Sequence, residues 1–576
     1  MKLLFKSLKL LEIVKMRKYL LFLFCFAIVT SVLETLSIGS VLPLMQIVFN
    51  SSEVIILNNL NQDLFKNVSD NQLLILMILI IISIFFIKNL VVFINNFFQL
   101  KYVLNFQIRI TKKLLNSYLD LTYEKFFSKN SSFYFKNLTL EILALSPFFT
   151  QVLILGSEII ILIGITSFLF WVNLKLSFIL ILIFASSALI YITIIKRRIK
   201  SWGEYRERCD TQRVKNLNHI FCLFTELKSK KIRNYFVKIF CFNTEGRYKT
   251  DFKEFLVNSF PRIYLEMIFI VTILSIATYL LFEKSEDEIK NIMPFIGLFV
   301  IYSIRLVPST NKIIYAYQTF KYRSASVNLF NNEYFENIKN FDAKNNLIEQ
   351  DFKFENNLTI KNVDFSYHKL KPIFLNLNLE IKKNSFIGIM GKSGSGKSTL
   401  LGLIYGLLNP SKGKILVDDK INISENYFTW ISKISLVSQN VFLVDDTIKK
   451  NIALGEHDTE IDQSRLSDSI KISQLTNLIN DLDKGINTTI GERGVRLSGG
   501  QIQRIGIARA LYKKAEILIL DESTNALDKE TEKDFLNFIY ELKKIITIIF
   551  VTHKMNVLKD ADSIYEIKEK KLNKIK

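Results

Sequence analysis

The sequence predicts a fold of two parts, an all-helical membrane half followed by a parallel α/β domain. Three observations lead to this prediction. The apolar residues of a chain that is 49% hydrophobic crowd into its first 315 positions. The basic residues collect in alternate connections between the apolar segments. Beyond about residue 350, short β-like runs alternate with helical ones, as in a parallel α/β domain.

Six apolar segments in the first half are long enough to cross a bilayer. They lie near residues 19–45, 73–98, 145–170, 176–195, 260–282 and 291–315. A helix needs about 20 such residues to cross about 30 Å of hydrocarbon, and buried helices of a soluble protein fit so many long, nearly uncharged segments poorly. We therefore expect a transmembrane domain with six spans over residues 1–330, a linker over 331–350 and a second domain over 351–576.

The net charge of +21 is compatible with nucleic-acid binding, but the placement of the charges indicates membrane topology instead. Residues 99–144 carry seven Lys or Arg and residues 196–256 carry sixteen, whereas the opposite connections carry only Lys66, Lys175, Lys284 and Lys290. Because Lys and Arg collect on the cytoplasmic side, both termini and the second domain are expected in the cytoplasm, with no nucleic-acid partner. The basic first 20 residues are predicted to form an amphipathic helix on the inner membrane surface and not a cleavable signal.

A phosphate-binding motif opens the second domain. The stretch "FIGIMGKSGSGKSTLL" places G-x-x-x-x-G-K-S between an apolar strand and an apolar helix. The glycines let backbone N–H groups wrap a phosphate, Lys397 neutralises phosphate oxygens, and Ser398 can hold a magnesium ion. The helix N-terminus adds the positive end of its dipole. The expected nucleotide-binding residues are Gly391, Lys392, Ser393, Gly394, Ser395, Gly396, Lys397, Ser398 and Thr399.

An acidic pair follows a second strand, "EILILDES", at Asp521 and Glu522. Asp521 is placed to bind magnesium, and Glu522 can orient or deprotonate the water that attacks a phosphate. Such a pair is by itself also compatible with an ordinary turn at a strand end. About twenty residues earlier, however, the chain carries "LSGGQIQRIGIARAL" at Leu497 to Leu511.

Together these motifs resemble the ATP-binding-cassette family. In that family "LSGGQ" covers the ATP held by another copy, which implies a homodimer with two nucleotides between the cassettes; the matching residues are Ser498, Gly499, Gly500 and Gln501. The same resemblance implies that Tyr367 stacks on adenine, that Gln439 contacts magnesium and water, and that His553 contacts the γ-phosphate. It also places Asp528 at a dimer-facing loop. Asn525, Lys554 and Met555 depart from the usual residues without touching the carboxylate or phosphate chemistry.

The resemblance thus implies ATP and Mg²⁺ as cofactors and ATP hydrolysis as the reaction. It assigns catalysis to Glu522, His553 and Gln439, and magnesium binding to Ser398, Gln439 and Asp521. Six spans before one cassette resemble a half-transporter of the ABC exporter type. The tips of the two basic stretches, near "LTYEKFFSKNSSFYF" and "HIFCLFTELKSKKI", are then expected to be coupling helices. A soluble cassette ATPase lacks six spans, and a gated channel on the same scaffold is a rarer alternative.

Charges within the predicted spans point to the substrate. Lys88, Arg262 and Arg305 are cations in or at the edges of spans, accompanied by Glu34, Glu158 and Glu266. Intramembrane charges often mark a substrate path but are also often paired, and the i, i+4 spacing of Arg262 and Glu266 lets them neutralise one another. If the three cations face a shared cavity, they suit a phosphate or pyrophosphate group.

Four segments of the membrane half resemble bacterial lipid-linked oligosaccharide flippases of the PglK type: "VLETLSIGSVLPLMQIV", "YEKFFSKN", "PRIYLE" and "RLVPSTNKII". That family moves a polyprenyl-pyrophosphate-linked sugar chain across the inner membrane, which implies an anionic lipid-linked glycan as substrate. Leu57, Leu60 and Leu64, at helical spacing in the first external connection, suit contact with a lipid tail or a plain surface element. The alternative is an exporter of lipid A, peptides or drugs.

Overall fold

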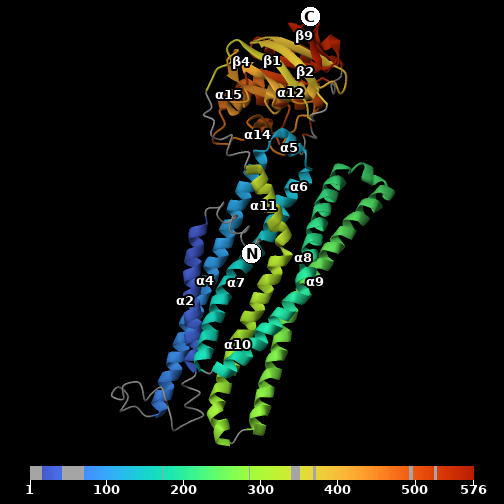
Figure 1. Cartoon of the computed structure of the whole chain (residues 1–576). Helices are drawn as coiled ribbons and strands as arrows, with labels where there is room; N and C mark the ends of the chain where they lie inside the picture. The colour runs from blue at the N-terminus through green and yellow to red at the C-terminus, as the bar shows by residue number, and fades with distance from the viewer. Residues whose placement is uncertain are drawn as a thin grey trace. The chain divides into compact units, whose positions relative to one another are not determined.

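The computed structural model describes residues 16–41, 70–172, 174–283, 286–338, 351–367, 371–491, 494, 497–524 and 529–576. It divides into two compact units, one made of the helices up to residue 341 and the other of residues 342–576 with the short segment Thr122–Phe126 (Figure 1). The expected N-terminal amphipathic helix, the external residues Leu57, Leu60 and Leu64, and the loop positions Asn525 and Asp528 lie outside the described residues.

The first unit is a bundle of long helices. Its main helices are α2 (Arg17–Gly39), α4 (Asp70–Leu119), α7 (Ile142–Val172), α8 (Leu174–Cys222), α9 (Lys230–Glu283), α10 (Glu286–Tyr322) and α11 (Ser324–Ile338). Helix α2 packs on α4 and α7, α7 packs on α10, and α8 packs on α9 along much of its length (Figure 1).

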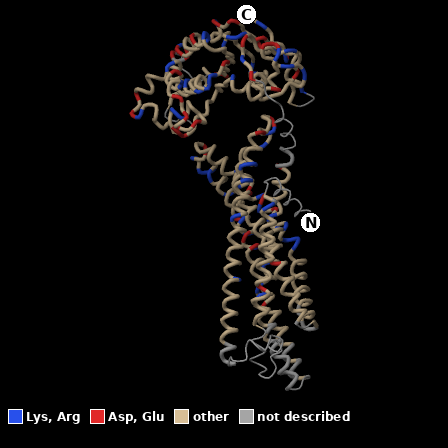
Figure 2. Tube along the Cα trace, turned by 90° about the vertical axis from the view of Figure 1, so that its left-hand side faces the viewer, with Lys and Arg blue, Asp and Glu red and all other residues tan. Residues whose placement is uncertain are grey.

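Five helical stretches in the described part of the chain are long and apolar enough to cross a membrane. They are Lys18–Gly39, Ile75–Leu119, Ser131–Trp171, Ser177–Cys222 and Lys230–Ser275. Large apolar side chains such as Phe86 and Phe93 are 70% and 72% exposed, which suits a lipid environment and would be unfavourable in water. Figure 2 shows few charged residues along this part of the bundle. The sixth predicted span lies in α10, whose side chains are described only in part, so the number six stays a prediction.

The two basic stretches predicted between the spans are largely helical. Helix α4 continues to Leu119, and α8 and α9 enclose only the short 3-10 turn η2 (Glu226–Lys228). At the other tip lie the short helices α5 (Tyr123–Phe127) and α6 (Ser131–Lys136), where Asn130 caps α6 by accepting from the Ser132 N–H at 2.9 Å.

A π-helical turn, η1 (Asn137–Glu141), joins α6 to α7. Lys136 and Glu141 at its two ends are each 1% exposed, and Arg206 of α8 is 2% exposed. Glu141 lies 3.7 Å from Lys136 Nζ and 3.6 Å from Arg206 Nη2, and Arg206 also donates to Ser326 Oγ of α11 at 2.8 Å. The buried charges therefore tie η1 to α8 and α11.

Helix α11 extends into the segment predicted as a linker, as far as Ile338. Asn331 is buried and donates to Val327 O at 2.9 Å, and Glu333 pairs with Lys129 at 2.6 Å. These contacts stabilise a helical turn that the polar composition of the segment did not predict.

The second unit combines two sheets with helices. The six-stranded sheet has the order β10-β9-β3-β8-β7-β6, and the four-stranded antiparallel sheet has the order β2-β1-β4-β5. The strands are β1 (Asn357–Phe365), β2 (Phe374–Lys382), β3 (Phe386–Gly391), β4 (Lys412–Val417), β5 (Ile421–Asn422), β6 (Ile434–Val437), β7 (Ile517–Asp521), β8 (Thr547–Thr552), β9 (Ser563–Lys568) and β10 (Lys571–Lys574). The main helices are α12 (Lys397–Tyr405), α15 (Gln463–Ile472), α17 (Gly499–Tyr512) and α18 (Lys529–Leu542), and the short ones are α13 (Tyr427–Lys433), α14 (Ile448–Ile452) and α16 (Thr476–Asn480).

Apolar strands form the core of this unit. All six residues of β8, "TIIFVT", are buried, as expected for a central strand that is covered on both faces. One cluster joins the four-stranded sheet, α12 and one side of the six-stranded sheet, and a second joins the other side to α17 and α18. Three parallel neighbours, β3, β8 and β7, are thereby held with their carboxyl ends at one edge.

Candidate functional site

The site is built at the carboxyl edge of three adjacent parallel strands. Met390 of β3 lies opposite Thr552 of β8, and Val551 of β8 lies opposite Asp521 of β7. In open α/β sheets ligands bind at this edge. The phosphate-binding loop follows β3, Glu522 follows β7 and His553 follows β8, so the register itself brings these predicted residues together.

The loop between β3 and α12 has the backbone shape of a phosphate cradle. Gly394 and Gly396 have φ values of +79° and +104°, which side-chain-bearing residues rarely adopt. A Cβ on Gly396 would lie 2.9 Å from Ile373 Cγ2. The buried Ser395 Oγ has no hydrogen-bond partner among the described residues. Free N–H groups at the start of α12 and this unpaired hydroxyl fit a bound phosphate.

Lys397 connects the loop to the acidic pair. Its Nζ donates to Gly391 O at 2.9 Å and lies 3.4 Å from Glu522 Oε1. His553 Nδ1 lies 3.9 Å from the same carboxylate oxygen. Glu522 has a left-handed φ of +46°, and its N–H donates to Val551 O at 2.9 Å, which fixes where its side chain starts. The geometry therefore brings the predicted lysine, glutamate and histidine into one cluster.

Asp521 lies beside this cluster at the end of β7. Burial and the neighbouring Glu522 raise the pKa of Asp521, while Lys397 opposes that shift. A nearby cation strongly stabilises the charged form of a carboxyl whose pKa is raised by burial and by a neighbouring carboxylate. No group of three metal-ligating side chains occurs among the described residues. The residues present fit Mg²⁺ nonetheless, because this ion is commonly held by one or two protein oxygens plus phosphates and water; Asp521 and Ser398 would supply the protein oxygens.

Tyr367 and Gln439 are the remaining predicted nucleotide contacts. The Tyr367 hydroxyl lies 3.5 Å from Thr399 Oγ1, and its side chain is 46% exposed, so its ring is available for stacking. Gln439 is exposed after β6, and its backbone oxygen accepts a hydrogen bond from Gln503 at 3.2 Å. The roles of Tyr367 and Gln439 stay predictions.

The "LSGGQ" segment forms the start of α17. Ser498 caps the helix in a reciprocal capping box: its Oγ accepts from the Gln501 N–H at 3.3 Å, and its own N–H donates to Gln501 Oε1 at 2.8 Å. The S-x-x-Q spacing is a sequence signal for this box. No hydrogen bond or ion pair between described residues joins this segment to the Lys397 cluster, so the covering of a second copy's ATP stays a prediction.

In the membrane half, Arg305 lies among carboxylates. Its Nε donates to Glu34 Oε2 of α2 at 2.7 Å, and Nη2 lies 3.5 Å from Glu158 Oε2 of α7. Ser309 and Lys312, one and two turns further along α10, bond to Glu158 at 2.7 and 2.6 Å. Sequence reasoning missed these two, although the spacing i, i+4, i+7 from Arg305 places them on one helix face.

The other two predicted cations have different surroundings. Lys88 Nζ lies 4.7 Å from the Phe85 ring and is near enough to Glu34 and Arg305 to interact with both charges. Arg262 instead pairs with Glu266 at 2.8 Å with its side chain 71% exposed. This is the alternative predicted from their i, i+4 spacing.

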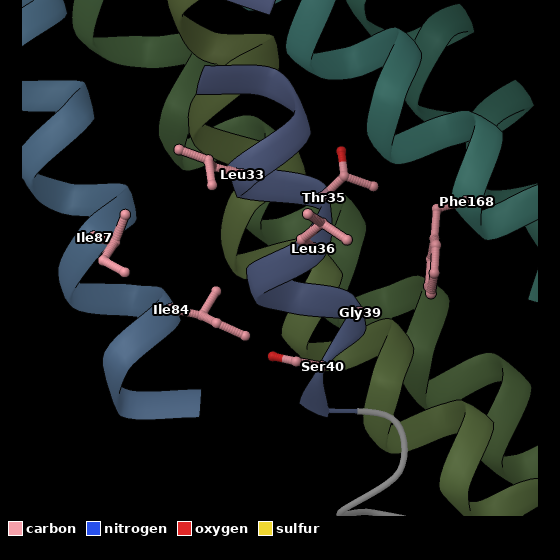
Figure 3. Close-up of a pocket in the computed structure, with 8 residues that line it drawn as sticks. All are labelled: Leu33, Thr35, Leu36, Gly39, Ser40, Ile84, Ile87 and Phe168. Carbon is pink, nitrogen blue, oxygen red and sulfur yellow. The ribbon is translucent and has the colours of Figure 1, made fainter. Parts of the chain in front are cut away.

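An apolar cavity of about 310 Å³ lies between α2, α4 and α7. Figure 3 shows its lining from three helices: Leu33, Thr35, Leu36, Gly39 and Ser40 of α2, Ile84 and Ile87 of α4, and Phe168 of α7. Glu34 and Lys88 adjoin lining residues in the sequence but are not among the residues that line the cavity.

Part of the second unit matches a known protein family. Residues 374–525 match the family described as ABC transporter. A Rickettsia typhi protein that bears the name of an export ATP-binding/permease protein is 42% identical over 219 residues, 37% of this chain and 37% of that protein. The ATP-dependent lipid A-core flippase of Francisella tularensis subsp. holarctica is 39% identical over 212 residues, 37% of this chain and 34% of that protein. The matches thus span only about a third of the length of these relatives.

One solved structure is similar over nearly the whole chain. It is described as a bacterial Atm1-family ABC exporter with ATP bound, and it matches with a TM-score of 0.73 at 20% identity, covering 95% of this chain and 94% of its own. At this identity the likeness shows the fold. The chain therefore has the fold of an ABC exporter half-transporter, in which apolar membrane helices precede an ABC transporter ATPase domain.

Proposed function

We propose that two copies of this chain form an ATP-driven exporter that moves a phosphorylated glycolipid across a bacterial inner membrane. The observation that carries the proposal is the cluster of Lys397, Glu522 and His553 beside a phosphate cradle, in a chain whose other half consists of membrane-length apolar helices.

The cluster supports hydrolysis because each group has a role at a γ-phosphate. Lys397 can exchange its contact with Glu522 for phosphate oxygens, and Glu522 is then released to accept a proton from the attacking water. His553, 3.9 Å from Glu522, lies where it can contact the γ-phosphate and the same water. Mg²⁺, held through Asp521 and Ser398, would neutralise charge on the transferring phosphate. The products are ADP and inorganic phosphate.

The Arg305 cluster supports an anionic substrate. Among its five described charged side chains, the three cations Arg305, Lys312 and Lys88 exceed the two carboxylates Glu34 and Glu158. A planar guanidinium can hold a phosphate through two hydrogen bonds. The apolar cavity between α2, α4 and α7 suits part of a lipid tail (Figure 3). A phosphate group on a lipid combines both features.

Two substrates share this chemistry. The resemblance of the membrane half favours a polyprenyl-pyrophosphate-linked oligosaccharide, whereas the Francisella relative is named for lipid A-core. That second match covers only 34% of the relative, and the substrate contacts must come from the membrane half. Both candidates therefore stand, with a phosphorylated glycolipid as their common class.

Transport into proteoliposomes distinguishes the candidates. Purified protein is reconstituted with ATP and Mg²⁺ and given a pyrophosphate-linked glycolipid, lipid A, a neutral glycolipid or a cationic drug. We expect ATP-dependent transfer of one or both phosphorylated lipids, and no transfer in the Glu522→Gln variant. Equal transfer of the neutral lipid, or preference for the drug, would contradict the proposed substrate class.

A further inference from the structure

We propose that the ion pair between Lys554 and Glu532 positions His553 for its contact with the γ-phosphate. The inference rests on the role proposed above for His553. Lys554 follows His553 directly in the chain, and its Nζ donates to Glu532 Oε1 of α18 at 2.7 Å. Both members of the pair are positioning residues, because they act on the reaction through the imidazole of His553.

Glu532 is a firm point of attachment for the lysine. Helix α18, which carries Glu532, is fixed in the core of the ATPase domain by its buried residues Phe535, Phe538 and Ile539. The side chain of Glu532 is 13% exposed, and that of Lys554 is 31% exposed. Water therefore screens this pair less than a pair on the open surface, and the attraction between the two charges is stronger.

The backbone around His553 couples its direction to that of Lys554. Thr552, buried at the end of β8, accepts a hydrogen bond from the Lys554 N–H through its Oγ1 at 3.1 Å. Lys554 is extended, with φ −99° and ψ 112°, and successive side chains of an extended chain point to opposite sides. His553 accordingly lies near Glu522, whereas Lys554 reaches Glu532 on another element. Rotation of this short segment would break both contacts together.

A second contact with α18 fixes the residues that follow. Lys554 leads into the short 3-10 helix η5 (Met555–Leu558), in which Val557 is fully buried. The Tyr540 hydroxyl of α18 donates to Val557 O at 3.1 Å. Helix α18 thus holds this segment at two points, and the ion pair of Lys554 is the point next to His553. Loss of the pair leaves the far end of the segment in place and frees the end that carries the imidazole.

Steady-state ATP hydrolysis by the full chain in detergent tests the inference. Lys554→Met removes the cation, and Glu532→Gln repeats the test from the other side if Lys554→Met does not elute as a folded protein. We expect kcat to fall about threefold to fivefold, the factor that one partly exposed ion pair supplies. The KM for ATP should stay unchanged, because the phosphate cradle and Lys397 are intact. Lys554→Arg keeps the charge and should retain the wild-type kcat.

The matched control is Lys543→Met, at the other end of α18. Lys543 is also 31% exposed and pairs with Asp562, so its loss should leave kcat unchanged. Equal losses in Lys554→Met and Lys543→Met, a loss in Lys554→Arg as large as in Lys554→Met, or a change confined to KM would overturn the inference.

The variant His553→Ala separates the inference from the role on which it rests. If His553→Ala hydrolyses ATP at the wild-type rate, the role of His553 fails and the positioning pair fails with it. If His553→Ala loses activity but Lys554→Met and Glu532→Gln do not, the positioning pair alone is wrong. A wild-type protein that does not hydrolyse ATP would contradict the proposed function itself.

Discussion

Arg305→Ala is the most informative change in the membrane half, because it removes a cation from between two nearly buried carboxylates. Glu34 and Glu158 are 7% and 4% exposed. Glu158 keeps Lys312 at 2.6 Å and Ser309 at 2.7 Å. Among the described residues, Arg305 is the one cation within salt-bridge distance of Glu34. The variant therefore leaves Glu34 without its ion pair.

The cost follows from the charge that the variant leaves on the nearly buried Glu34. Removing one partner of a buried pair costs about 3–5 kcal/mol. Arg305 is 20% exposed, so water relieves part of this cost. We expect a loss of about 3 kcal/mol in the free energy of unfolding. The control Arg262→Ala breaks a pair that is 71% exposed on the arginine side and should cost far less than Arg305→Ala, because exposed ion pairs contribute little to stability.

A double variant separates structural and substrate roles. Glu34→Gln with Arg305→Ala removes the stranded charge, so it should recover more than half of the stability lost in Arg305→Ala. Thermal unfolding in detergent measures the four members of this cycle, and proteoliposomes measure transport. If the double variant is no more stable than Arg305→Ala, the pairing argument is wrong. If it is stable and still moves a phosphorylated glycolipid at the wild-type rate, Arg305 is a structural partner only and does not hold the head group.

Three further predictions concern the ATPase domain. Glu522→Gln should abolish ATP hydrolysis but retain ATP binding, whereas Lys397→Ala should weaken equilibrium ATP binding itself; near-wild-type hydrolysis in Glu522→Gln would refute the assignment. Ser498→Ala should lower hydrolysis while nucleotide binding to the separate monomer is unchanged, and a fully active monomer in detergent would contradict the dimeric site. The pKa of Asp521 is higher in the folded than in the unfolded protein. The unliganded protein therefore loses stability as the pH rises through the pKa of the folded state. Asp521→Asn should thus melt no lower than wild type at neutral pH but lose magnesium-dependent ATP binding; a large drop in melting temperature would show that the carboxylate supports the fold.

The nucleotide site could be predicted from sequence because its determinants are local. A strand, a glycine loop and a helix define the cradle around Lys397, and a strand end defines Asp521 and Glu522. Parallel pairing of β3, β8 and β7 then brings these segments together without further information. The capping box of Ser498 and Gln501 was not predicted, although S-x-x-Q is its signature.

The partners of Arg305 could not be predicted in the same way. Glu34 and Glu158 are 271 and 147 positions away along the chain, and only helix packing determines which carboxylate faces which cation. Arg262 was the easier case because its partner lies one helical turn away. Polar composition was likewise a poor guide to the end of α11, where Asn331 bonds to Val327 O within the helix and Glu333 makes a tertiary ion pair with Lys129.

The π-helical turn Asn137–Glu141 has a mechanical consequence. A π turn holds more residues than an α turn, and each residue of an α-helix turns the chain by about 100°. Returning η1 to α geometry would therefore rotate α6 relative to α7 by about that angle. Lys136 and Arg206 could then no longer both contact Glu141, and the charges of Lys136 and Glu141, which are each 1% exposed, would have to separate. The ion cluster thus opposes rotation of α6 against α7, and a one-residue deletion in 137–141, which removes the extra residue of the π turn, should let the segment become α-helical without that rotation.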